Sequence, residues 1–213
     1  MRFEFGWGVL AALMATSGVA VGGAHDEILA AVRADRTDEV VSYLQKGMDP
    51  NTSDAAGTTL LMTAAANANA PLVAALLRLH ANPLKINKYG ESALALAALN
   101  GHLEVVRLLV EGGATFSAPG WGALHYAVFN GHVDVVRYLI DQGGDVNVRA
   151  PNRHTPLMLA ARNGHDEIVR ILLSAGANPS MGDLEGNTAL EIAQRAGNRE
   201  IADLLRTMTP AGR

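Results

Sequence analysis

"TPLMLAARNGHDEIVRILLSAGANP", residues 155–179, carries the signals for two short helices and the turn between them. Thr155 can cap the first helix, and Pro156 follows at the first helical position, where its missing N–H costs no hydrogen bond. Gly164 tolerates the positive φ that ends a helix. Apolar residues then recur at helical spacing over 168–173. The stretch therefore predicts a helix–turn–helix unit.

Similar units recur along the chain at a nearly constant interval. Equivalent leucines stand at Leu61, Leu94, Leu124, Leu157 and Leu190, so the intervals are 33, 30, 33 and 33 residues. A degenerate earlier copy begins at Asp26. A single unit cannot bury both faces of its helices, so stability must come from stacking against neighbouring units.

The period, the motif and its order resemble the ankyrin repeat over roughly residues 26–206. The resemblance implies an all-α solenoid of about six helix-turn-helix repeats, with β-turn fingers at the repeat junctions and a cap at both ends. We expect a signal peptide at 1–24, an ankyrin-repeat domain at 25–207 and a C-terminal tail at 208–213. The expected repeats span about 26–53, 54–86, 87–116, 117–149, 150–182 and 183–206.

Two copies depart from the pattern. The second has Ala68 where later copies have glycine, followed by Pro71, so we expect its inter-helix turn to be less regular. The fourth has lost about three residues just ahead of Trp121, which predicts a shortened finger. Trp121 and the bend at 117–119 would line the resulting notch.

The N-terminal segment differs from the repeats. It has the build of a secretory signal peptide, with Arg2 near its start, an apolar run over about 9–21, and the small residues Gly22, Gly23 and Ala24 at its end. The expected cleavage follows Gly23 or Ala24. These features predict export, and the chain resembles exported ankyrin-repeat proteins of bacteria in size and layout, which implies a periplasmic protein. Glu4 weakens the positive start of the segment, so the alternatives are a secreted protein or one anchored by an uncleaved signal.

Composition excludes several classes of site. The net charge is -4, without the clustered Lys and Arg that nucleic acid or anionic lipid requires. We therefore expect no nucleic-acid partner and no membrane contact beyond the signal peptide. Cysteine is absent, which excludes disulfides and thiolate metal sites. The chain has no phosphate-loop motif and no HExxH motif. We expect no catalytic residues and no cofactor, and hence no enzyme.

The histidines allow a metal interpretation and a structural one. His102, His132 and His165 recur after glycine at the helix–helix turn, one repeat apart. The resemblance implies that they are turn residues and that His125 forms hydrogen bonds within and between repeats. We favour these structural roles and expect no metal site. His154 stands at a variable finger position, where surface contact and simple solvation are both open.

The resemblance also implies where a partner binds, namely on the concave face formed by the fingers and the first helices. Glu91 is among the matching finger positions, but large apolar and basic side chains concentrate in the middle copies. Aromatic and arginine side chains are enriched at binding hot spots. The expected protein-binding residues are Tyr89, Leu99, Trp121, Phe129, Arg149, His154 and Arg162. The alternative is that Trp121 fills the gap beside its own shortened finger.

These observations predict an exported protein-binding module that acts as a monomer. Its resemblance to exported bacterial ankyrin-repeat proteins implies that it modulates, or protects against, an envelope protein. Its partner is another protein whose identity the sequence leaves open. One alternative is a secreted effector that binds a host protein. An envelope enzyme, a metal-binding protein or a structural spacer is less favoured.

Overall fold

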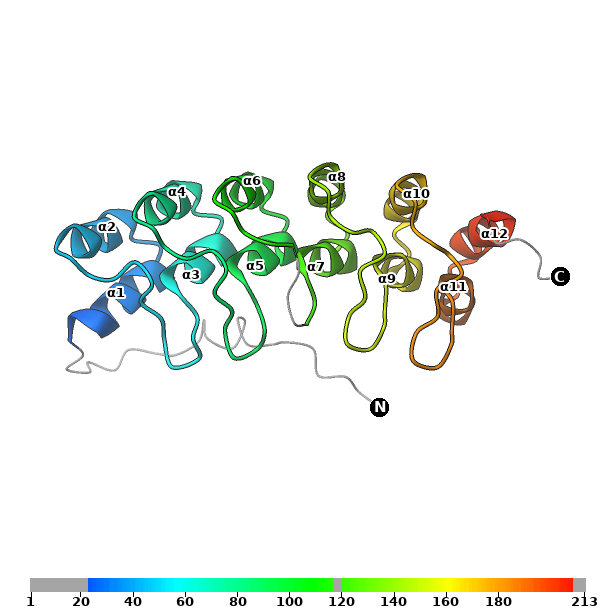
Figure 1. The fold of residues 1–213 in the computed structure, drawn as a ribbon, viewed down its shortest axis with the longest axis horizontal. Helices are drawn as coiled ribbons and strands as arrows, with labels where there is room; N and C mark the ends of the chain where they lie inside the picture. Colours follow the sequence, from blue (N-terminus) through cyan, green and yellow to red (C-terminus); the bar gives the residue numbers. More distant parts are fainter. Residues whose placement is uncertain (1–22, 117–119, 209–213) are drawn as a thin grey trace.

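The computed structural model describes residues 23–116 and 120–208, which form twelve helices and no strand within those ranges (Figure 1). The first helices of the six pairs are α1 (Ala24–Arg33), α3 (Leu60–Ala66), α5 (Ala93–Leu99), α7 (Ala123–Phe129), α9 (Pro156–Asn163) and α11 (Ala189–Ala196). The second helices are α2 (Thr37–Gln45), α4 (Ala70–Arg78), α6 (Leu103–Glu111), α8 (Val133–Asp141), α10 (Asp166–Ser174) and α12 (Arg199–Met208). The predicted all-α solenoid is confirmed.

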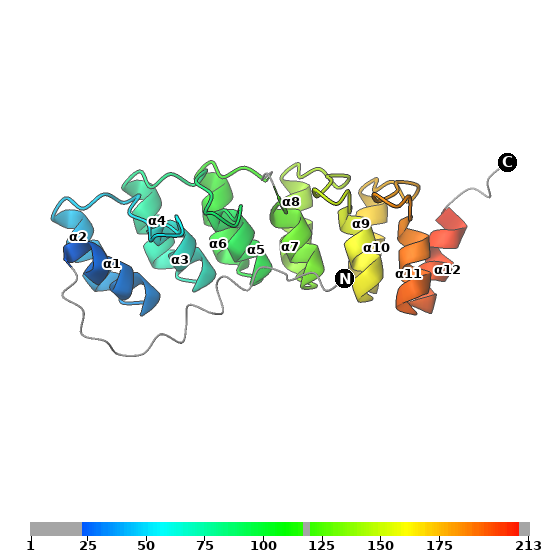
Figure 2. The same ribbon diagram turned by 90° about the horizontal axis from the view of Figure 1, so that it is seen from below.

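The helices form two rows along the long axis of the molecule (Figure 1). The first helices make one row, the second helices make the other, and the fingers project on the side of the first helices. Seen from below, the pairs stand side by side (Figure 2). From α3 to α9, each first helix packs against the first helices of both neighbouring pairs and against its own second helix. We call the surface formed by the fingers and the first helices the finger face.

Small side chains allow the first helices to pack closely. One alanine recurs at the same position of five successive first helices and is fully buried in each of them: Ala64, Ala97, Ala127, Ala160 and Ala193. Four of the five equivalent leucines are also buried, namely Leu61, Leu94, Leu124 and Leu157. Close packing of this kind leaves little space for larger residues at the alanine positions.

The local signals in 155–179 act as expected. The Oγ1 atom of Thr155 accepts the N–H of Met158 at 3.3 Å and so caps α9. Gly164 takes φ 76° at the end of that helix. Thr59 caps α3 and Ser92 caps α5 in the same way.

The expectation of a less regular turn in the second copy is wrong. Ala68 adopts φ 61°, the left-handed conformation that Gly101 takes at φ 74° in the next copy. Asn69 then has φ -79° and ψ 75°, close to the φ -80° and ψ 74° of His102. The Asn69 N–H donates to Ala64 O at 3.0 Å, as His102 N–H does to Ala97 O. The turn keeps its shape because packing on both sides outweighs the cost of a Cβ at positive φ.

The chain ends bear on the signal-peptide prediction. Residues 1–22 and 209–213 lie outside the described ranges, so most of the expected signal peptide does too. Helix α1 begins at Ala24, so cleavage after Gly23 would leave this helix whole. Within the described part of the chain, no helix has the length and apolar character needed to cross a bilayer.

Candidate functional site

A regular finger is closed by one Asp or Asn side chain near its tip. Asp54 Oδ1 accepts the N–H groups of Ala56 and Thr58, at 2.8 and 2.9 Å. Asn87 Oδ1 accepts those of Tyr89 and Glu91 in the next finger, at 2.9 and 3.0 Å. The closing side chain satisfies two backbone donors at once, which fixes the turn.

The finger between α6 and α7 is the exception. It spans 112–122, three residues fewer than the finger 142–155 between α8 and α9. Residues 117–119, including the Pro119 bend expected to line a notch, lie outside the described ranges. In the part that is described, Ala123 N–H donates to Phe116 O at 3.3 Å and ties the finger to the start of α7.

Trp121 lies near the end of this shortened finger, just before α7, and its ring contacts three aromatic side chains of that helix. The ring centroids lie 5.9 Å from His125, 5.5 Å from Tyr126 and 5.4 Å from Phe129. We call Trp121, Tyr126 and Phe129 the aromatic cluster. All three are half-buried, and two of them, Trp121 and Phe129, are among the predicted protein-binding residues. Burial, aided by the Glu91 carboxylate, raises the pKa of Tyr126 to about 12, so its hydroxyl stays neutral at physiological pH.

A row of equivalent residues ends the first helices on the finger face. Leu99, Phe129 and Arg162 are the predicted contact residues in this row, and all three are half-buried. Their carbonyl oxygens accept hydrogen bonds from the following repeat. His132 Nε2 lies 2.9 Å from Leu99 O, and His165 Nε2 lies 3.1 Å from Phe129 O. The backbone beneath the row is therefore held by the next pair of helices.

The same contacts assign the turn histidines. His102 Nε2 lies 3.0 Å from Ala66 O, so all three turn histidines bond a carbonyl of the preceding repeat. The predicted structural role of His102, His132 and His165 is confirmed. Over residues 23–116 and 120–208, no group of three or more His, Asp or Glu side chains could hold a metal ion.

His125 is fully buried and joins two fingers. Its Nδ1 accepts the Gly122 N–H at 3.3 Å, and its Nε2 donates to His154 O at 3.3 Å. Burial lowers its pKa to about 4. The neutral ring, with one acceptor and one donor nitrogen, fits these two bonds, which confirms the predicted hydrogen-bonding role.

His154 is held between two fingers and is only half-buried. Its Nε2 lies 3.7 Å from Asp183 Oδ2 of the next finger. Its Nδ1 is buried and has no hydrogen-bond partner within the described part of the chain. Burial lowers the pKa of His154, while the Asp183 carboxylate opposes that shift. His154 therefore contributes to contact between fingers as well as to the surface.

Glu91 does not face solvent, contrary to the sequence expectation. Its side chain is 2% exposed, and its Oε2 accepts the Asn87 Nδ2 at 2.9 Å. The position is equivalent to Trp121, but a regular finger turns this residue inward against its own closing side chain. The pairing of Asn87 with Glu91 four residues later, as of Asp183 with Asn187, is a sequence signal that could have indicated this.

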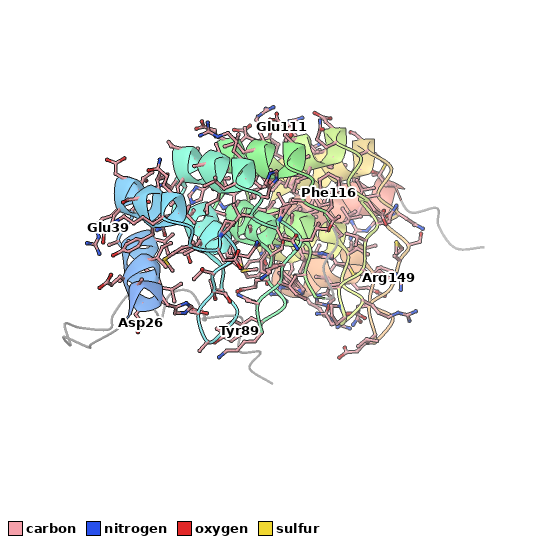
Figure 3. All side chains as sticks on the ribbon, turned by 60° about the vertical axis from the view of Figure 1, so that its left-hand side comes forward. Asp26, Glu39, Tyr89, Glu111, Phe116 and Arg149 are labelled. Atoms are coloured by element: carbon pink, nitrogen blue, oxygen red, sulfur yellow. The ribbon has the colours of Figure 1, made fainter. Side chains whose placement is uncertain are left out.

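Tyr89 and Arg149 are exposed on the fingers that flank the shortened one. Figure 3 shows Tyr89 on a projecting finger, and Glu111 on the opposite side of the array. The finger of Tyr89, which is 52% exposed, also exposes Leu84 by 53% and Ile86 by 45%. The sequence interpretation missed these two residues, although apolar and basic residues alternate in "LKIN" over 84–87.

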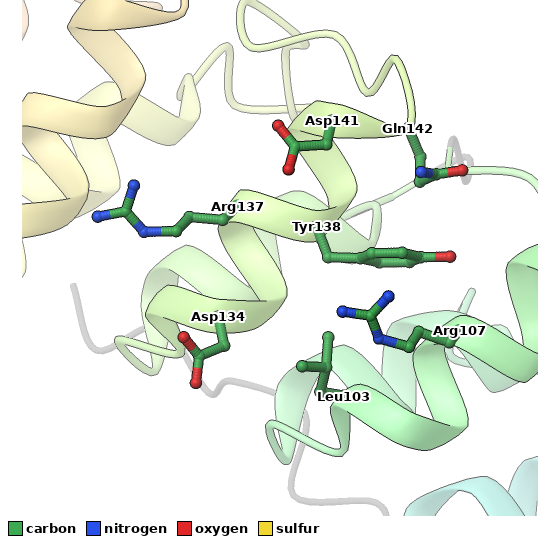
Figure 4. Close-up of a pocket in the computed structure, with 7 residues that line it drawn as sticks. All are labelled: Leu103, Arg107, Asp134, Arg137, Tyr138, Asp141 and Gln142. Atoms are coloured by element: carbon green, nitrogen blue, oxygen red, sulfur yellow. The ribbon is translucent and has the colours of Figure 1, made fainter.

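The outer row of helices carries shallow grooves of a different kind. Figure 4 shows the groove between α6 and α8, where the Arg107 guanidinium lies over the Tyr138 ring at 4.5 Å from its centroid. Asp134, Arg137 and Asp141 complete its charged lining. The two signs of charge are mixed there, so the groove favours no charged ligand.

The geometry agrees with a comparison to known families. A family model described as ankyrin repeats (3 copies) matches residues 28–120, 61–150 and 124–210. These matches overlap and together cover almost all of the described chain. Among curated proteins, no match to the chain was found.

Proposed function

Since the chain belongs to the ankyrin-repeat family, whose members are in general protein-binding modules rather than enzymes, we propose that it binds a partner protein through the finger face of its central repeats. The shortened finger carries this proposal. It stands directly before the aromatic cluster, at the one junction where three finger residues are lost. The binding residues are Tyr89, Leu99, Trp121, Phe129, Arg149, His154 and Arg162.

The aromatic cluster has the properties of a binding anchor. Its rings are partly exposed, yet they are held by one another at 5.4 to 5.5 Å. A side chain already fixed in this way loses little conformational entropy when a partner docks. Trp and Tyr are also enriched among the residues that dominate binding energy.

The competing interpretation is that Trp121 only fills the space beside the shortened finger. Its packing against the core supports that interpretation. The two roles predict different results for one substitution. As a filler, Trp121 contributes to folding alone. As an anchor, it contributes more to binding than to folding.

The test is Trp121→Ala, measured for both stability and partner affinity. Affinity capture from an envelope extract with the wild-type chain supplies the partner for titration. We expect binding to weaken by about 2–4 kcal/mol. Stability should fall by less than this, because the half-buried ring has less core packing to lose than a fully buried one. Unchanged affinity of the folded fraction, together with a much lower melting temperature, would assign Trp121 to packing alone.

Tyr43→Ala is the matched control. Tyr43 is also a half-buried aromatic residue, but it lies on α2 in the outer row, where its hydroxyl donates to Glu27 Oε2 at 2.6 Å. This variant should lose stability without losing affinity. Glu91→Ala is unsuitable as a control because it would remove a buried hydrogen bond.

We further propose that the protein is exported to the periplasm, acts there as a monomer, and restrains or protects against an envelope protein. The N-terminal segment supports export. N-terminal sequencing from the native host should begin at Ala24 or His25. An intact Met1 in the soluble cytoplasm would contradict export. A secreted effector that binds a host protein is the second candidate, and recovery of the protein outside the cell would favour it.

A further inference from the structure

Charge is distributed unevenly between the two sides of the central repeats. On the outer side, each of α6, α8 and α10 carries two acidic residues and one arginine. On the finger face, the first helices α5 and α7 carry no acidic residue at all. The overall charge of -4 is therefore not spread evenly over the two sides.

The two fingers that flank the shortened one are basic. The finger 79–92 exposes Lys85 and Lys88, and the finger 142–155 exposes Arg149 and Arg153. We call these two segments the basic fingers. Lys88 Nζ lies 5.3 Å from the centroid of the Tyr89 ring, so this cation is held beside an exposed aromatic side chain.

Acidic groups within the two basic fingers leave these cations largely uncompensated. Glu91 is buried and bonded to Asn87, which removes it from the surface. Asp145 is exposed at the base of its finger, where its Oδ1 accepts the Asn147 N–H at 2.8 Å. In the described ranges, none of the salt bridges involves Lys85, Lys88, Arg149 or Arg153, although His154 of the second basic finger faces Asp183. The first regular finger differs, because its Asp54 pairs with Arg33 at 3.1 Å.

Along the array, the aromatic cluster therefore lies between the two basic fingers. Stacked helices lie about 10 Å apart, so the basic fingers are about 20 Å from one another, with the aromatic cluster between them. An extended segment covers about 3.3 Å per residue, so about three residues span each half of that distance.

From this arrangement we infer that the partner presents an acidic segment with one apolar side chain at its centre. The inference rests on the proposed function and specifies its chemistry. The apolar side chain packs on the aromatic cluster, and acidic groups about three residues to either side face the basic fingers. Attraction of opposite charge accelerates association and selects the partner, while the apolar contact supplies most of the affinity. The same basic fingers would repel a partner segment of positive charge.

The test uses a fluorescent peptide of seven residues, a central leucine with three acidic residues on each side. Its binding to the full chain is followed by fluorescence anisotropy at low and high salt. We expect saturable binding that weakens as salt rises, because salt screens exposed charges. A peptide with lysine at the six acidic positions, and one with serine in place of leucine, should each bind at least about tenfold more weakly.

The matched variants change the same charge on opposite sides of the molecule. Lys88→Glu with Arg149→Glu should weaken binding of the acidic peptide at least about tenfold. Arg107→Glu with Arg170→Glu, on the outer helices, makes an equal change in net charge and should alter affinity less than about twofold. Both double variants must melt as the wild type does. If the first does not, Lys88→Gln with Arg149→Gln replaces it.

Three results would overturn the inference: no saturable binding of the acidic peptide, equal binding of the lysine peptide, or equal loss in both double variants. Tighter binding to vesicles containing phosphatidylglycerol would assign the basic fingers to a lipid surface and would also overturn it. The proposed function is tested separately. It stands, whatever the peptide results, if the wild-type chain captures a protein that the Trp121→Ala chain captures more weakly. It is refuted if the two chains capture that protein equally.

Discussion

Ala68→Gly should stabilise the protein, because Ala68 occupies a backbone conformation that disfavours a side chain. Its φ of 61° matches the left-handed values of Gly101, Gly131 and Gly164, which are 74°, 77° and 76°. An L-residue pays about 1–2 kcal/mol for this conformation. Glycine removes this cost, but it loses about 0.5–1 kcal/mol more backbone entropy on folding than alanine does, which offsets part of the stabilisation. The net gain should be about 0.5–1 kcal/mol.

Ala175→Gly is the control with the opposite expected sign. Ala175 is exposed like Ala68 and also follows a helix, but its φ is -86°, which any residue adopts without strain. Only the entropic cost of glycine remains there, so this variant should lose about 0.5–1 kcal/mol. The two variants make the same chemical change and differ in backbone conformation alone.

Urea denaturation followed by circular dichroism measures both free energies of unfolding. The reasoning holds if Ala68→Gly shifts the midpoint upward and Ala175→Gly shifts it downward, with equal slopes. Destabilisation by both substitutions would refute it. That result would mean that the turn after α3 does not hold Ala68 at positive φ in solution.

Two further predictions concern the buried core. The pKa of His125 is lowered to about 4 from an ordinary 6.5, so the unfolded chain binds this proton first as the pH falls. The free energy of unfolding should therefore drop by about 3 kcal/mol between pH 6.5 and 4, and His125→Asn should remove most of that dependence in urea melts at several pH values. Leu→Ala at the buried Leu124 or Leu157 should cost roughly 2–5 kcal/mol, and less at Leu205 of the terminal repeat, where fraying disrupts fewer interfaces. Equal losses at all three sites in denaturant melts would contradict the stacking argument.

The helical architecture could be predicted because its signals are local and repeated. The cap at Thr155 and the positive φ at Gly164 depend only on neighbouring residues, and the structure has both. The turn after α3 was harder, because Ala68 lacks the local preference that its conformation requires. There, stacking against both neighbouring repeats determines the backbone, and a sequence window does not contain those contacts.

The candidate site was less predictable than the fold, for a related reason. Equivalent positions in the repeat do not have equivalent exposure, since exposure depends on what the finger itself supplies. Glu91 is turned inward by Asn87, whereas Trp121 belongs to a finger that is three residues shorter, and its ring packs against Phe129 of α7. Their position in the repeat predicts that both residues lie on one exposed surface. In the structure, only the tryptophan is partly exposed.

The shortened finger explains why packing and binding need not compete at Trp121. A regular finger uses a polar closing side chain, and the residue before its last one is bonded to that side chain, as Glu91 is to Asn87. With three residues lost, contacts with Tyr126 and Phe129 hold the tryptophan instead, and they leave part of its ring exposed. The carbonyl of Phe129 is held in turn by His165 of the next repeat. The packing that stabilises the ring thus also fixes its orientation, and a partner that docks there meets an anchor already in place.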